Sequence, residues 1–115
     1  MEITNAAKTL GALAQETRLT TFRLLVQHGS RGMPAGEIAR ALEVPHNTLS
    51  THLNILVNAG LVDSRRESRS IIYSVNFRGV REMLGYLMQD CCQADENDCL
   101  AVLDRMFPEC CSSNS

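Results

Sequence analysis

The stretch GEIARALEVPHNTLSTHLNILVNAGLV, Gly36 to Val62, carries two helical patterns separated by a break. In the second pattern Leu49, Leu53 and Leu56 recur at spacings of four and three, which places them along one face of a helix. Pro45 fits the start of that helix, because the N–H that proline lacks would go unpaired there. The first pattern has as its expected inward face Glu37, Ile38, Ala39 and Leu42. The stretch therefore predicts two helices joined by a tight turn.

The opposite face of the second helix is polar but uncharged. It is formed by Asn47, Ser50, Thr51, Asn54 and Asn58. Solvated helix faces usually carry Lys, Glu, Gln or Arg, whereas Asn, Ser and Thr each cost up to roughly 0.7 kcal/mol in a helix relative to Ala. Short side chains that both donate and accept hydrogen bonds suit the base edges of a DNA major groove. We interpret this helix as a recognition helix, and an ordinary solvated face is the alternative.

A β-hairpin is predicted after these helices. Ile71, Tyr73 and Val75 alternate with other residues, which indicates a strand with its bulkiest side chains on one face. The segment between the two strands, residues 64–70, contains three arginines: Arg65, Arg66 and Arg69. Such a hairpin tip suits the phosphate backbone and the minor groove. An ordinary charged turn is the alternative.

Three segments together form a specific pattern. They are Ser50-x-His52-Leu53-x-x-Leu56-x-x-x-Gly60-Leu61-Val62, Arg66-Glu67-Ser68-Arg69-x-x-x-Tyr73 and Leu13-Ala14-x-x-x-Arg18-Leu19-x-x-Phe22. The pattern resembles the ArsR/SmtB family of winged helix-turn-helix metalloregulatory repressors, and the resemblance covers Leu10 to Cys92. It implies a mainly α fold with one β-hairpin wing, and a homodimer formed through the N-terminal and C-terminal helices. It also implies double-stranded operator DNA as the partner, so we expect a DNA-binding protein rather than an enzyme.

Particular side chains of the second helix and of the hairpin are expected to contact DNA. The residues expected to read bases are His46, Asn47, Thr48, Ser50 and Thr51. Those expected to set the register on the DNA backbone are His52, Arg65, Arg66 and Arg69. The family usually has glycine where Ser68 stands. Because glycine enters positive φ freely and serine does not, the turn type of the wing stays open.

The flanking segments predict three more helices. An N-terminal helix carries an apolar stripe of Ile3, Ala6, Ala7, Leu10 and Leu13, which must bury against the body or a partner subunit. A helix from Gln15 to His28 is expected to turn Leu19, Phe22, Leu25 and Val26 inward, and a loop follows at residues 30–33. A helix from Phe77 to about Asp90 carries a packing stripe of Val80, Met83, Leu84, Leu87 and Met88, whose expected partner is its copy in a second subunit.

A chain of 115 residues is just large enough to form one small domain with its own core. Charge nevertheless divides the chain into two parts. Residues 1–80 hold nine basic and six acidic residues, a net charge of +3, whereas residues 81–115 hold two and seven, a net charge of −5. We expect a DNA-binding and dimerisation domain at 1–92 and an acidic, cysteine-containing tail at 93–115. The chain shows neither a membrane-spanning run nor a secretory signal, so we expect a cytoplasmic protein.

All five cysteines lie in the last quarter of the chain: Cys91, Cys92, Cys99, Cys110 and Cys111. An odd count in a reducing compartment argues against a disulfide framework. Zinc sites usually have CxxC pairs or nearby histidines, which this segment lacks. Thiolates select soft ions, and a three-coordinate ion such as trivalent arsenic or antimony suits the spacing better. Some relatives of the resembled family have a Cys-Cys pair and a third cysteine after the last helix, and Cys91, Cys92 and Cys99 match that arrangement.

The sequence thus predicts a transcriptional repressor of a metalloid-resistance operon, released from DNA when arsenic(III) or antimony(III) binds these thiolates. A thiol redox switch, in which cysteine oxidation releases the DNA, is an alternative of a different class. A remote alternative comes from Cys99 to Arg105, which fits the C-x5-R loop of some phosphatases and arsenate reductases. That loop needs nest-forming residues after a strand, and here the intervening residues are apolar helix formers.

Overall fold

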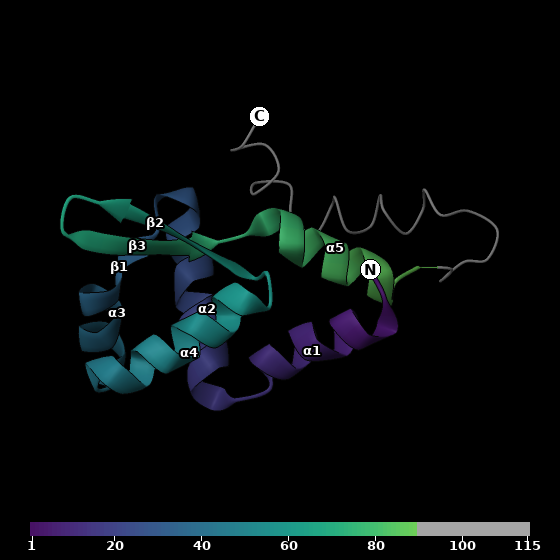
Figure 1. The fold of residues 1–115 in the computed structure, drawn as a ribbon, viewed down its shortest axis with the longest axis horizontal. Coiled ribbons are helices and arrows are strands. Elements are labelled where there is room, and N and C mark those ends of the chain that lie inside the picture. Colours follow the sequence, from purple (N-terminus) through teal and green to yellow (C-terminus); the bar gives the residue numbers. More distant parts are fainter. Residues whose placement is uncertain (90–115) are drawn as a thin grey trace.

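The computed structural model describes residues 1–89, which fold into helices around a small sheet (Figure 1). Four helices precede the wing, and one follows it. The elements are α1 (Ile3–Leu13), α2 (Glu16–His28), the 3-10 turn η1 (Gly29–Arg31), β1 (Met33–Pro34), α3 (Ala35–Leu42), α4 (His46–Asn58), β2 (Val62–Glu67), β3 (Ser70–Val75) and α5 (Phe77–Leu87). This order is that of a winged helix-turn-helix, with α3 and α4 as the paired helices and β2–β3 as the wing. The predicted mainly α fold is confirmed.

The sheet has a strand that the sequence did not predict. Its order is β1-β3-β2 and both pairings are antiparallel, with Met33 opposite Tyr73 and Pro34 opposite Ile72. The expected loop at residues 30–33 therefore ends in β1. A Cβ on Gly32 would overlap the carbonyl oxygen of Tyr73, so only glycine lets the chain approach β3 this closely. Two residues are too few to show the period of a strand, and the prediction of an isolated hairpin was incomplete for that reason.

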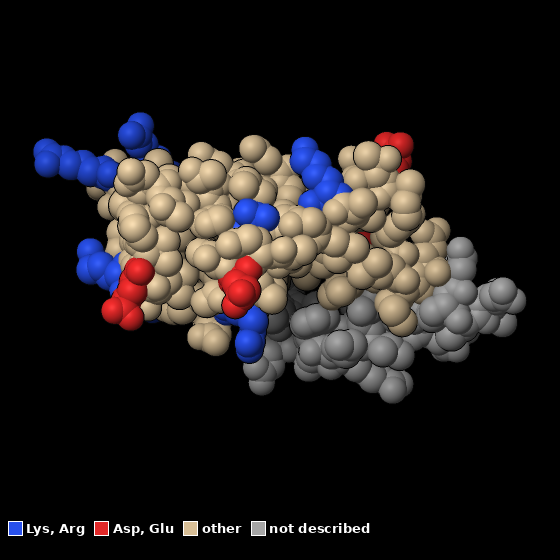
Figure 2. All heavy atoms as spheres, turned by 90° about the horizontal axis from the view of Figure 1, so that it is seen from below, with Lys and Arg blue, Asp and Glu red and all other residues tan. Residues whose placement is uncertain are grey.

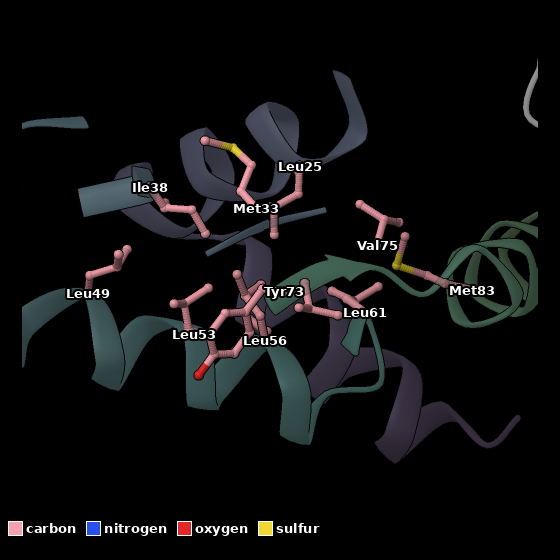
Figure 3. Packing of buried hydrophobic residues seen from close by; sticks show 12 residues of the cluster. Leu25, Met33, Ile38, Leu49, Leu53, Leu56, Leu61, Tyr73, Val75 and Met83 are labelled. Carbon is pink, nitrogen blue, oxygen red and sulfur yellow. The ribbon is translucent and has the colours of Figure 1, made fainter. Parts of the chain in front are cut away.

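The leucine stripe of α4 forms the centre of the core. Leu49, Leu53 and Leu56 have 0% exposure, as their spacing predicted. Side chains from the neighbouring helices and strands lie around them (Figure 3). The same buried cluster includes Leu25, Met33, Ile38, Leu61, Val62, Tyr73, Val75 and Met83. The core thus fixes α4 by its apolar face and leaves its polar face outside.

Some inward-facing predictions were wrong. Leu25 is buried as predicted, but Leu19 is 45% exposed and Val26 is also exposed, because the buried face of α2 runs through Thr21 and Leu25. Threonine is tolerated there because the Thr21 hydroxyl donates to the carbonyl of Thr17 at 2.7 Å. Glu37 of α3 and Ile71 of β3 are likewise exposed, and Ile72, on the other face of β3, is buried. The spacing of apolar residues alone does not show which face of each helix or strand is buried.

Helices α1 and α5 pack against each other at the end of the molecule away from the wing (Figure 1). Each buries only a narrow face within the protomer: Ala6, Thr9 and Ala12 in α1, and Met83 in α5. Large apolar side chains stay exposed on both helices: Ile3, Leu10, Leu87 and Met88. Over the described residues, the helices are too short and too polar to cross a membrane.

Candidate nucleic-acid interface

The outward face of α4 is the first part of the candidate interface. His46, Asn47, Thr48 and Thr51 are exposed, and Ser50 is half-buried. All five are short or planar polar side chains, and they lie on the helix half that starts beyond the tight turn after α3. The predicted base-reading residues are therefore brought together on one accessible surface. A surface of this kind can donate to and accept from base edges.

The start of α4 adds backbone donors to this surface. Pro45 precedes the helix in an extended conformation, and its side chain caps none of the first-turn N–H groups. Uncapped N–H groups and the positive end of the helix dipole favour an anion such as a phosphate group. Within the helix, the Thr51 hydroxyl donates to the carbonyl of Asn47 at 3.3 Å, which leaves its oxygen free to accept.

Charge is distributed differently from these hydrogen-bonding groups. Seen from the side on which α4 lies, most of the surface is uncharged; Lys and Arg side chains project at the end that carries the wing, and a few other charged side chains are scattered over the rest of this face (Figure 2). The uncharged surface of α4 suits contacts with bases, and the cations at the wing end suit contacts with the DNA backbone.

The wing turn is tighter than predicted. Strands β2 and β3 include most of residues 64–70, so only Ser68 and Arg69 form the turn. Ser68 has a φ of 56°, and Arg69 has no positive φ. A positive φ at the first turn residue alone is the pattern of a type II′ hairpin turn. Arg69 thus lies at the tip, whereas Arg65 and Arg66 lie on β2.

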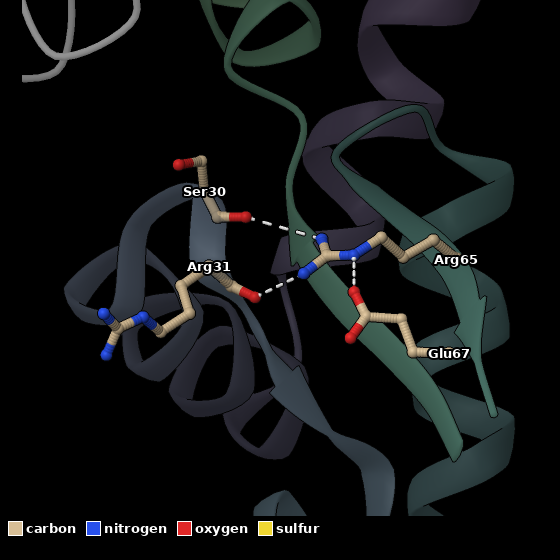
Figure 4. Close-up of polar contacts among 4 residues, drawn as sticks. All are labelled: Ser30, Arg31, Arg65 and Glu67. Carbon is tan, nitrogen blue, oxygen red and sulfur yellow. Dashed lines mark hydrogen bonds and ion pairs between the residues drawn. The ribbon is translucent and has the colours of Figure 1, made fainter. Parts of the chain in front are cut away.

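Arg65 is held within the protein. Its Nε donates to Glu67 Oε2 at 2.6 Å, its Nη2 to the carbonyl of Arg31 at 2.7 Å and its Nη1 to the carbonyl of Ser30 at 3.4 Å (Figure 4). The guanidinium therefore joins the wing to the η1 turn. Because side chains alternate along a strand, Arg66 lies on the opposite face of β2 from Arg65 and Glu67. The three wing arginines do not form one cluster.

Known proteins place this architecture in a family. Residues 6–65 match a family of helix-turn-helix domains. The transcriptional activator HlyU of Vibrio cholerae is 33% identical over 95 residues, which cover 80% of this chain and 85% of HlyU. The chain belongs to the ArsR/SmtB family. It is a DNA-binding transcriptional regulator and not an enzyme.

Solved structures agree with this assignment. An ArsR-like transcriptional regulator from Rhodococcus aligns with a TM-score of 0.69 at 26% identity, covering 90% of this chain and 93% of that one. The homodimeric winged helix-turn-helix domain of Mb0332 from Mycobacterium bovis, a possible ArsR-family regulator, aligns with a TM-score of 0.63 at 29% identity, covering 79% and 81%. The resemblance inferred from the sequence motifs is confirmed at the level of the family.

One contact of this ArsR/SmtB regulator could not be predicted from the sequence. His52, expected at the DNA backbone, is half-buried, and its Nδ1 lies 3.3 Å from Nη1 of Arg18 in α2. Arg18 was part of the motif that carried the resemblance, but nothing in its spacing from His52 pointed to a contact. The two residues are 34 positions apart and meet because α2 packs against α4.

The predicted inducer ligands lie outside the described residues. Cys91, Cys92 and Cys99 all follow residue 89, as do the C-x5-R segment from Cys99 to Arg105 and the predicted domain boundary between 92 and 93. Within residues 1–89, no group of three or more His, Cys, Asp and Glu side chains could hold a metal ion. Thiolate binding by the regulator therefore stays a prediction from the sequence.

Proposed function

We propose that this regulator is a homodimeric repressor of a metalloid-resistance operon that leaves its operator when trivalent arsenic or antimony binds Cys91, Cys92 and Cys99. The observation that carries the DNA-binding part is the outward face of α4. Its Asn, Ser, Thr and His side chains are accessible and neutral, and the leucines on its other face are completely buried. His46, Asn47, Thr48, Ser50 and Thr51 read bases, and His52, Arg66 and Arg69 contact the backbone.

Exposed apolar side chains support the homodimer. Ile3 of α1 is 70% exposed and Leu87 of α5 is 49% exposed, and Leu10 and Met88 extend the same pair of helices. These residues would become buried between two copies of the α1–α5 pair. Burial of each such side chain contributes on the order of 1.5–3 kcal/mol. Two subunits related by a twofold axis would then present their α4 helices to half-sites about 34 Å apart, one turn of DNA.

The distribution of cysteines supports the inducer. None precedes residue 91, so the thiols are confined to the segment that follows the dimer helix α5. Thiolates bind soft, lone-pair-bearing ions such as arsenic(III). Binding at the end of α5 would tilt one subunit against the other and spoil the spacing of the two α4 helices. By reciprocity, operator DNA would weaken arsenic binding by the same factor.

The test begins with a DNA duplex, the selected duplex, that the full-length, reduced protein selects from a random library. The protein bound to this duplex is titrated separately with arsenite, antimonite, Zn(II) and hydrogen peroxide, and release is followed by fluorescence anisotropy. We expect release by arsenite or antimonite at concentrations comparable to that of the protein, and none by Zn(II). Release by peroxide alone would replace the proposal with a thiol redox switch, and failure to select any duplex would overturn DNA recognition by α4.

A further inference from the structure

We propose that Arg18 is a positioning residue for DNA binding: it holds the His52 ring in the tautomer that carries its proton on Nε2. The inference rests on the proposed role of His52 at the DNA backbone. It adds a residue of α2, outside the helix-turn-helix and the wing, to the set that determines DNA affinity.

Arg18 is anchored through both its backbone and its side chain. Its backbone N–H donates to the Gln15 side chain, which caps the start of α2, at 2.9 Å. Its Nε donates to the carbonyl of Ala12 at 2.6 Å. This carbonyl belongs to the last turn of α1, where helix carbonyls lack intrahelical partners and the dipole favours a cation. The guanidinium is therefore anchored at the α1–α2 junction before it reaches α4.

The contact with His52 has only one consistent arrangement of protons. A guanidinium has N–H donors and no acceptor, so Nδ1 of His52 must accept from Nη1 across the 3.3 Å separation. A neutral imidazole that accepts at Nδ1 carries its proton at Nε2. The ring therefore keeps one donor, directed away from Arg18. A phosphate oxygen is an acceptor only, so this is the tautomer that a backbone contact requires.

The position of His52 explains why its tautomer would affect DNA binding. It follows Thr51 on α4 and precedes the fully buried Leu53, so the ring lies at the border between the core and the reading face. Without Arg18 the ring would distribute its proton between Nδ1 and Nε2 and would sample other orientations. Part of the population would then present an acceptor to the phosphate, and binding would weaken without the loss of any residue that touches DNA.

The experiment is a double-mutant cycle on the selected duplex with the full-length protein. The variants are Arg18→Met, which keeps the aliphatic stem, His52→Ala and the double variant. Arg23→Ala is the control, because it removes a charge from the same helix about 140° away around its axis. We expect Arg18→Met to raise Kd about three- to tenfold, in the range for one hydrogen bond. The double variant should bind no worse than His52→Ala, and Arg23→Ala should bind within about twofold of the wild type.

A second measurement does not depend on DNA. The ¹⁵N shifts of the His52 ring distinguish a protonated from an unprotonated nitrogen. We expect the wild type to show unprotonated Nδ1 and protonated Nε2, and Arg18→Met to move both shifts toward a mixture. Circular dichroism checks that the variant is folded, and Arg18→Gln replaces it if it is not.

The outcomes separate this inference from the proposed function. Additive losses in the cycle would mean that Arg18 acts on DNA independently of His52, and an unchanged tautomer in the Arg18 variant would mean that Arg18 does not set it. Either result overturns the inference and leaves DNA recognition by α4 intact. If the wild-type protein selected no DNA duplex from the library, the proposed function would be overturned instead.

Discussion

Gly79 in the first turn of α5 lies directly against the backbone carbonyl of Gly60, which follows Ala59, the C-cap of α4. A Cβ built on Gly79 would overlap that oxygen. The contact is fixed from both sides, because Asn76 caps α5 by accepting from the Gly79 N–H at 3.0 Å and its own N–H donates to the carbonyl of Leu61 at 2.9 Å. The start of α5, the proposed dimer helix, therefore packs directly against the end of α4, the proposed recognition helix.

Gly79→Ala should therefore separate α5 from α4. We expect a loss of about 1–3 kcal/mol in the free energy of unfolding, as for overpacked sites, measured by urea denaturation. Gly85→Ala is the matched control in the same helix, because a Cβ there meets nothing within 4 Å. In monomeric conditions it should be neutral or stabilising by up to about 1 kcal/mol. Equal effects of the two substitutions would contradict the close packing of Gly79.

The adjacent arginines of β2 should behave differently when each is replaced by alanine. Arg65→Ala removes the bonds to Glu67, Ser30 and Arg31, so we expect the free energy of unfolding to fall by about 1 kcal/mol. Arg66→Ala should leave stability unchanged and lower the magnitude of the salt slope of DNA binding by up to about one unit. The measurements are urea denaturation and Kd on the selected duplex at several salt concentrations. If both variants changed stability and salt slope in the same way, Arg65 and Arg66 would not have these separate roles in stability and phosphate binding.

Asn47→Ala and Ser50→Ala test base reading by α4. Each should weaken binding to the selected duplex by about 1–3 kcal/mol, because a base edge loses its partner. Binding to a scrambled duplex of the same length should change little. The ratio of the two dissociation constants, measured at one salt concentration, is the decisive quantity. An unchanged ratio would assign these side chains to helix positioning.

Ser68→Gly tests the wing turn. Ser68 has a φ of 56°, a region where a side chain costs roughly 1–2 kcal/mol and glycine costs little. We expect the substitution to stabilise the protein by up to about 1 kcal/mol, since the added flexibility of glycine in the unfolded chain offsets part of the gain. Ser70→Gly, two residues further on in β3, should be destabilising. Thermal unfolding of both variants decides whether the turn has the left-handed residue at position 68.

Single Cys→Ser variants test the proposed inducer site. Cys91→Ser, Cys92→Ser and Cys99→Ser should bind the selected duplex normally and resist release by arsenite. Cys110→Ser and Cys111→Ser serve as controls and should be released nearly as the wild type is. Loss of the response in only a Cys110 or Cys111 variant would show that the ligands were wrongly chosen. A normal response in all five variants would end the proposal of thiol sensing.

Local patterns in the sequence determined the architecture. The spacing of Leu49, Leu53 and Leu56 was enough to orient α4, because a helix that buries three leucines has only one way to face the core. The neutral residues between them identified the reading face for the same reason. The break at Glu43 to Pro45 and the arginine-rich hairpin completed the winged helix-turn-helix. The cysteines, and with them the choice of inducer, remain a prediction from the sequence.

Only the tertiary structure decided which polar groups meet. The sequence placed Arg65 with the phosphate contacts, and only the structure shows its bonds to Ser30 and Arg31, which lie 35 and 34 residues earlier in the chain. The contact between Arg18 and His52 and the strand β1 beside β3 depend on equally distant segments. Periodicity reports which side of an element is apolar. It carries no information on which long side chain reaches across to a neighbour, since that depends on how the packed core orients the elements.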